Sequence, residues 1–120
     1  MKAREVGFTE NLRMKTAGEF DFVFARPCRS ANRCFTALAR SNQRPYPRLG
    51  LIISKKCAKS AVKRNRLKRL IRESFRHSQQ KLAGLDIVVI GKNVAVAKTS
   101  QELFTLLNKQ WMELERCKES

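Results

Sequence analysis

The pattern of apolar and polar residues predicts a short helix near the beginning of the chain. Thr16, followed three residues later by Glu19, forms a capping-box pattern that favours a helix start. Apolar residues then recur at helical spacing, and Pro27 ends the helix. The residues at this spacing are Phe20, Val23 and Phe24. Residues 1–14 lack such a pattern, and we expect them to form a flexible basic arm.

Three later segments have the patterns of β-strands. Residues 33–40 alternate between two sets of positions, as in a strand with two different faces. Residues 48–54 are more apolar, and Gly50 among them permits a close approach to the backbone. Residues 86–91 contain Ile-Val-Val-Ile, which is typical of a buried strand.

A strongly basic helix is predicted between the second and third of these strands, from about residues 58–60 to about residue 79. Its apolar face contains Leu67, Leu70, Ile71, Ser74 and Phe75. A stripe on the opposite face contains Asn65, Arg69, Arg72 and Arg76, with Lys68 beside it. Like charges four residues apart cost an isolated helix about 0.2–0.5 kcal/mol per pair, and Glu73 is the only local acid. We therefore expect a polyanion to neutralise this face.

A second capping-box pattern, at Thr99 and Glu102, predicts a final helix to residue 114. Its core-facing stripe contains Leu103, Leu106, Leu107, Trp111 and Leu114. The polar tail, residues 115–120, is expected to fray. Residues 15–114 then form one α+β domain, a sheet with helices packed on it.

The charge balance narrows the choice of partner. The chain has 26 Lys and Arg against 10 Asp and Glu, a net charge of +16, which indicates nucleic acid first and an anionic membrane surface second. Its apolar stretches are far shorter than the roughly 20 residues that a membrane span needs, and the N-terminus does not resemble a signal peptide. Ser74 and Ser78 interrupt the apolar face that a membrane-surface helix requires. We expect a cytoplasmic protein without membrane contact.

The titratable residues do not form a recognisable catalytic or metal site. The cysteines, at positions 28, 34, 57 and 117, lack C-x-x-C spacing, and His77 is the only histidine, so a zinc site is excluded. We expect reduced thiols in or near the core. Two aspartates and eight glutamates are scattered along the chain, whereas metal-dependent phosphodiester cleavage gathers carboxylates and metal-free RNA cleavage often uses a histidine pair. A partner must therefore supply any chemistry.

Three phenylalanines, Phe20, Phe24 and Phe35, have two interpretations. Their periodicity favours core packing. A base-stacking surface is the alternative, because stacking is worth about 1–3 kcal/mol per base.

Two segments, Arg48–Lys56 and Ala61–Glu73, strongly resemble the signature of the bacterial ribonuclease P protein subunits. That signature is an R-x-G strand, a K-K pair and a helix with the pattern A-V-x-R-N-R-x-K-R-x-x-R-E. The first helix also matches the F-x-x-V-F pattern of that family, and residues 85–90 suit its fourth strand. The resemblance covers about residues 15–112.

The resemblance implies an αβββαβα order with a four-stranded sheet, similar to the second domain of ribosomal protein S5. It also implies a left-handed βαβ crossover, against the right-handed form of about 98% of such units. The implied activity is the removal of the 5′ leader from precursor tRNA by hydrolysis. The RNA subunit would carry the active site and its Mg2+ ions, and the protein would be a monomer bound 1:1 to that RNA.

The resemblance further implies two binding surfaces. The surface for the catalytic RNA would contain Lys55, Lys56, Arg64, Asn65, Arg66, Lys68, Arg69, Arg72 and Arg76. A cleft between the first helix and the sheet would receive the single-stranded leader and contain Phe20, Phe24, Phe35 and Leu38. Leu38 stands where many relatives have an aromatic residue, so contact there is expected to be apolar. For Asn65, a helix-cap or loop-facing role is the alternative.

Two rival functions share the basic helix. A general RNA-binding or ribosome-associated protein would work outside any enzyme complex, and copurification of a catalytic RNA would distinguish it. A DNA-binding helix-turn-helix would need a partner helix at short spacing before the basic one, and the sequence predicts none.

Overall fold

The computed structural model of the chain describes residues 12–119. A four-stranded sheet forms its centre, with β1 (Cys28–Ala31), β2 (Phe35–Ser41), β3 (Arg48–Ile52) and β4 (Leu85–Gly91) in the order β1-β2-β4-β3. β2 is antiparallel to both β1 and β4, whereas β3 and β4 are parallel. β4 lies inside the sheet, and its first five residues are all buried, which confirms the prediction from its apolar run.

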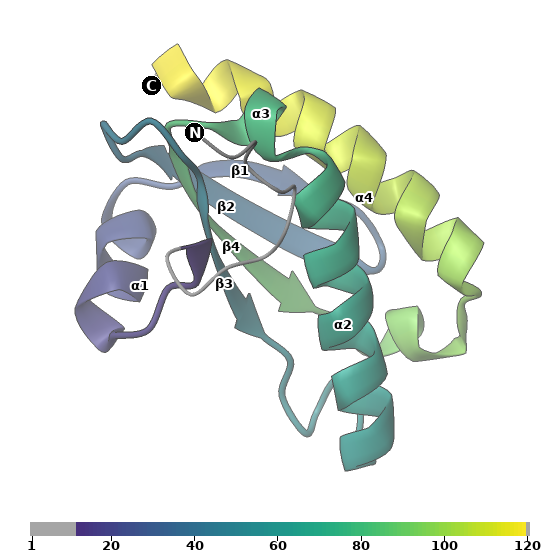
Figure 1. Cartoon of the computed structure of the whole chain (residues 1–120). Coiled ribbons are helices and arrows are strands. Elements are labelled where there is room, and N and C mark those ends of the chain that lie inside the picture. The colour runs from purple at the N-terminus through teal and green to yellow at the C-terminus, as the bar shows by residue number, and fades with distance from the viewer. Residues whose placement is uncertain (1–11, 120) are drawn as a thin grey trace, which may run out of the picture.

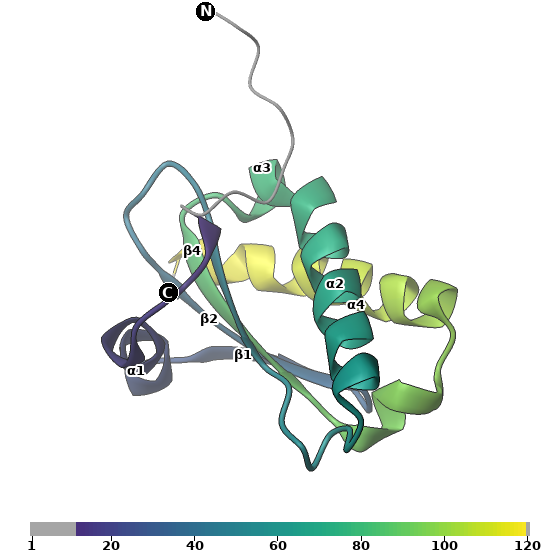
Figure 2. The same cartoon turned by 60° about the horizontal axis from the view of Figure 1, so that its bottom comes forward.

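Helices cover both faces of the sheet (Figure 1). α2 (Ala61–His77) and α4 (Ser100–Leu114) pack on one face, and α1 (Ala17–Ala25) packs on the other, as the turned view in Figure 2 shows. α3 (Gln79–Leu82) and the 3-10 helices η2 (Asn93–Ala97) and η3 (Glu115–Glu119) complete the chain. α2 connects the parallel strands β3 and β4, and this crossover is left-handed (Figure 1). The α+β fold implied by the resemblance is therefore confirmed.

Both predicted capping boxes are present. At α1 the Thr16 hydroxyl accepts from the backbone N–H of Glu19, and the Glu19 carboxylate accepts from the Thr16 N–H. At α4 Thr99 and Glu102 make the same reciprocal pair. These bonds satisfy backbone donors that a helix start leaves without partners.

The main core lies between the sheet and the α2/α4 layer. Trp111 is 1% exposed, and its ring meets Phe75 edge-on at 6.0 Å between centroids. Its indole N–H donates to the Ser74 hydroxyl at 2.8 Å, which explains a serine on the apolar face of α2. The stripes predicted for both long helices thus form one core.

The hairpin at the start of the sheet differs from the prediction. The strand expected over residues 33–40 is present as β2, but the residue pattern missed β1, which precedes it and is joined to it by a turn at Asn32. The Asn32 side chain accepts from the backbone N–H groups of Cys34 and Phe35. β1 reads Cys-Arg-Ser-Ala and lies at the sheet edge, so it carries too little apolar alternation to be recognised.

The expectation of four reduced thiols is wrong for one pair. Cys28 on β1 and Cys117 on η3 form a disulfide, with 5.8 Å between their Cα atoms. Residues 115–119, which were expected to fray, instead form η3, and Cys117 is buried. Cys34 and Cys57 are free and buried, and this burial raises the pKa of both thiols.

The first described residues lie along the outer edge of the sheet. Arg13 pairs with Leu49 in a parallel bridge, and the Met14 N–H donates to the Leu49 carbonyl at 3.0 Å. Leu12 and Met14, on either side of Arg13, are buried. The expected flexible arm is therefore wrong for residues 12–14, while residues 1–11 lie outside the described part of the chain.

Candidate nucleic-acid interface

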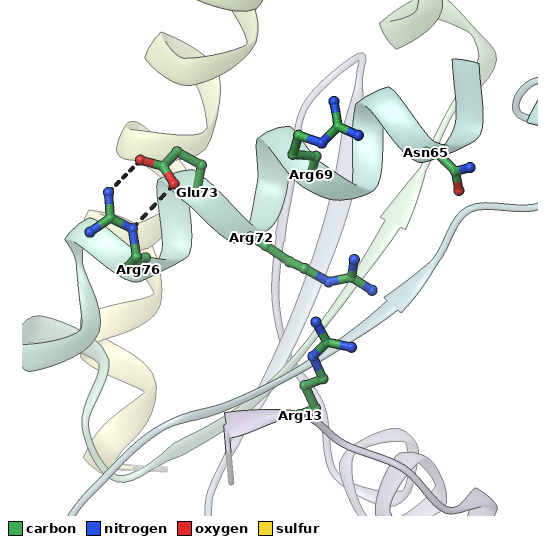
Figure 3. A pocket seen from close by; sticks show the side chains of 6 residues that line it. All are labelled: Arg13, Asn65, Arg69, Arg72, Glu73 and Arg76. Atoms are coloured by element: carbon green, nitrogen blue, oxygen red, sulfur yellow. Dashed lines mark hydrogen bonds and ion pairs between the residues drawn. The ribbon is translucent and has the colours of Figure 1, made fainter. Parts of the chain in front are cut away.

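The polar stripe of α2 lines a pocket of about 380 Å³. Its lining residues are Arg13, Asn65, Arg69, Arg72, Glu73 and Arg76 (Figure 3). Four arginines and one carboxylate thus share the lining of a single pocket. The spacing of the stripe along the helix, read from the sequence, correctly predicted that its four residues share one face.

Arg13 is a member of this pocket that sequence reasoning missed. Figure 3 shows its side chain extending toward Arg72 on α2. Burial lowers the pKa of Arg72, and the charge of Arg13 lowers it further. The only local signal was the three-residue alternation Leu12-Arg13-Met14, which is too short to identify a strand. An anion between the two guanidinium groups would interact favourably with both.

Glu73 is already engaged within this pocket. Its carboxylate accepts from the Arg76 guanidinium and lies 3.0 Å from the His77 ring. The hydrogen bonds from Arg76 and then from His77 lower the pKa of Glu73 to about 2. Because this pKa is depressed, the Glu73 carboxylate is ionised above that pH. It neutralises part of the charge of Arg76, which then attracts other anions less strongly.

Replacing Glu73 with glutamine is expected to tighten binding to RNA. The change removes the one acid that lines the pocket, so a phosphate no longer competes with this carboxylate for Arg76. One extra contact makes the slope of log affinity against log salt steeper by up to about one unit. Glu115→Gln on η3 alters the net charge equally outside the pocket and is the control. Weaker binding by Glu73→Gln alone would show instead that Glu73 orients Arg76.

Two of the predicted RNA-binding arginines also hold the fold together. Arg64 donates to the carbonyls of Ala58 and Lys59, both at 2.9 Å, and so fixes the loop before α2. Arg66 donates to the carbonyl of Lys98 and to Ser100 at the start of α4. A guanidinium group has five N–H donors, so these contacts leave others for a ligand.

The three predicted lysines lie outside the pocket. Lys55 and Lys56 are exposed in the turn after β3, and Lys68 is half-buried on α2. They extend the basic surface along α2 and the loop that precedes it.

The α1 side of the sheet presents a second, apolar surface. Half-buried residues on this side are Phe20, Phe22, Leu38, Ile52 and Ile90. Phe20 lies directly over Gly50, where an added Cβ would come within 2.6 Å of its ring, so the predicted close approach is confirmed. Phe24 is 41% exposed, at a ring-centroid distance of 6.5 Å from Phe20.

Phe35 does not belong to this surface, and its prediction as a cleft residue is wrong. It is fully buried in the core on the α2/α4 side. Successive residues of a strand point to opposite faces, so Phe35 shares its face with Ala37 and Ala39, while Leu38 faces α1. The sequence pattern shows this alternation but not which face α1 covers.

Two further observations concern metals and membranes. Within residues 12–119, the side chains of His, Cys, Asp and Glu do not gather in groups of three or more that could hold a metal ion. No helix in this part of the chain combines the length and the apolar character needed to span a membrane.

Comparison with known proteins identifies the family. Residues 8–115 match the family model described as Ribonuclease P. The ribonuclease P protein component of Pseudoalteromonas atlantica is 45% identical over 97% of this chain and 98% of its own length. That of Vibrio parahaemolyticus is 45% identical over 91% of this chain and 92% of its own.

Solved structures agree with this result. The RNase P protein of Staphylococcus aureus superposes with a TM-score of 0.76 at 29% identity, covering 86% of this chain and 94% of its own. The RNase P protein of Thermotoga maritima gives 0.67 at 34% identity, covering 87% and 96%. The chain therefore belongs to the ribonuclease P protein family.

Proposed function

We propose that this protein binds the catalytic RNA of ribonuclease P through the α2 pocket and the 5′ leader of precursor tRNA through the α1 side of the sheet. It acts as a monomer, in a 1:1 complex with that RNA, in the cytoplasm. The protein is then a subunit of a tRNA-processing endoribonuclease, and hydrolysis takes place on the RNA.

The observation that carries this proposal is the convergence of four arginines on the α2 pocket. Met14 bonds to the β3 edge and holds the backbone of Arg13, while α2 presents Arg69 and Arg72 from a rigid helix. Guanidinium groups pair with phosphate oxygens through two parallel hydrogen bonds, so a pocket lined by four of them suits the phosphate groups of a folded RNA. A general RNA-binding protein would share this property, but the family match favours the subunit role.

The α1 side suits a single strand because it combines an apolar floor with aromatic side chains. Ile52 and Ile90 are register partners, and both are half-buried beside α1. Phe24 leaves much of its ring exposed for a base. Mature tRNA lacks the leader, so binding there favours precursor over product.

We assign the hydrolysis step to the RNA partner because of which metal-binding side chains the protein has and where they lie. A cluster of carboxylates that could hold Mg2+ is missing from residues 12–119, so the described residues do not fit a metal site of the protein's own. Mg2+ held by the RNA partner would supply activation of water and stabilisation of charge. The protein contributes binding and orientation.

Reconstitution tests the proposal. Purified protein added to the cognate RNA at low Mg2+ is expected to accelerate release of the 5′ leader. Protein alone is expected to release none. Cleavage by RNA-free protein, or no acceleration by the added protein, would contradict the assignment.

Replacing Phe24 with alanine is expected to weaken binding of precursor tRNA about tenfold and to leave mature tRNA binding unchanged. One stacked base is worth about 1–3 kcal/mol, and about 1.4 kcal/mol corresponds to tenfold. Met112→Ala on α4 also removes an exposed apolar side chain, 63% exposed, and is the control. Equal loss for both tRNAs would contradict leader stacking at Phe24.

A further inference from the structure

α1 buries only one side chain completely, and its other apolar contacts with the sheet come from the half-buried rings of Phe20 and Phe22. It is nine residues long, and Val23 is its one fully buried residue. Isolated helices of this length are marginal in water. Polar contacts add to this apolar packing, and two arginines of the sheet supply them.

Arg48 holds the first turn of α1. Its Nη1 donates to the Glu19 carboxylate at 2.7 Å, while its Nε and Nη2 donate to Asp86 at 2.9 and 2.6 Å. Asp86 is fully buried and also accepts from Asn42 at 2.8 Å. The bidentate pair fixes the orientation of the guanidinium group, which then presents one N–H to α1.

Arg40 holds the last turn of α1. Its Nη1 donates to the Phe22 carbonyl at 2.8 Å, and its guanidinium carbon lies 3.8 Å from the centroid of the Phe22 ring. A cation at this end satisfies a terminal carbonyl and suits the helix dipole. Arg40 and Arg48 are both register partners of Asp86, so the two contacts come from one row of the sheet.

We propose that Arg48 and Arg40 are positioning residues that set α1 on the sheet and thereby determine the preference for tRNA that carries a leader. Glu19 directly precedes Phe20, so the ion pair with Arg48 sets where that ring lies against Gly50. The Phe22 contact sets the end of α1 that carries Phe24. This inference rests on the proposed leader binding at the α1 side.

The two capping boxes offer a matched test. Glu19→Gln keeps an acceptor for the cap, because glutamine also serves at this position, but it removes the ion pair with Arg48. Glu102→Gln makes the same change at α4, whose carboxylate has no ion pair with an arginine among the described salt bridges. Each variant is reconstituted with the catalytic RNA. Affinities for long-leader precursor tRNA, for mature tRNA and for the RNA subunit are measured, together with thermal unfolding.

Glu19→Gln is expected to weaken precursor binding about three- to tenfold and to leave the other two affinities unchanged, while Glu102→Gln changes none of the three. Equal precursor affinity in the two variants, or a loss shared by mature tRNA, would overturn the proposal. Phe20→Ala is measured in parallel. A selective loss in Phe20→Ala without one in Glu19→Gln refutes the positioning role alone, whereas no selective loss in Phe20→Ala contradicts leader binding itself.

Discussion

Replacing Arg69 and Arg72 together with alanine is expected to weaken binding to the catalytic RNA by roughly 30-fold at moderate salt. Both side chains line the α2 pocket, and about 1 kcal/mol for each phosphate contact gives this factor. The loss of two contacts also flattens the slope of log affinity against log salt by between one and two units. Filter binding or fluorescence titration over a series of salt concentrations measures both effects.

The control removes the same charge elsewhere. Lys109 on α4 and Lys118 on η3 are exposed and lie outside the pocket. Their double replacement with alanine changes the net charge equally, so any weakening that it causes reports long-range attraction alone. If the two double variants lost affinity equally, the pocket would have no special role, and the general charge of the protein would account for binding.

Replacing Asp86 with asparagine is expected to destabilise the protein by about 3 kcal/mol. Asp86 is fully buried and holds Arg48 by two hydrogen bonds. Removing one charge of a buried pair leaves the other without compensation, which typically costs about 3–5 kcal/mol. Glu19 still neutralises part of the Arg48 charge, so the lower end applies. Denaturant unfolding at neutral pH measures the change.

The only other aspartate provides the matched control. Asp21 lies exposed on α1, and Asp21→Asn is expected to change the free energy of unfolding by less than about 0.5 kcal/mol. A comparable midpoint for both variants would show that the Asp86–Arg48 pair adds little to stability over a neutral hydrogen-bonded pair.

The long elements could be predicted from the sequence because each carries its own local signal. α2 and α4 have apolar stripes and cap residues, and β4 has a continuous apolar run. β1 and η3 carry no local signal of their own, because their stability comes from pairing with β2 and from the Cys28–Cys117 bond across 89 residues. Contacts between segments so far apart in the sequence produce no periodic pattern of apolar residues within either segment.

In the candidate site, too, the features with a local sequence signal could be predicted, and those that depend on distant contacts could not. The helical period placed Asn65, Arg69, Arg72 and Arg76 on one face, and the structure brings them together. The additional tasks of Arg64 and Arg66 depend on where the preceding loop and α4 lie. The assignment of Phe35 required knowing which face of the sheet α1 covers, and alternation alone is symmetric in this respect.

The pairing of residues 12–14 with β3 affects the design of shortened variants of the protein. β3 is the last strand of the sheet, and without this segment it would present unpaired backbone groups to other molecules. The same pairing places Arg13 at the α2 pocket. A variant that begins at Lys15 would therefore expose the edge of β3 to pairing with other molecules, and it would also lack the Arg13 charge at the pocket. Such a truncation could not separate self-association from weaker binding to RNA.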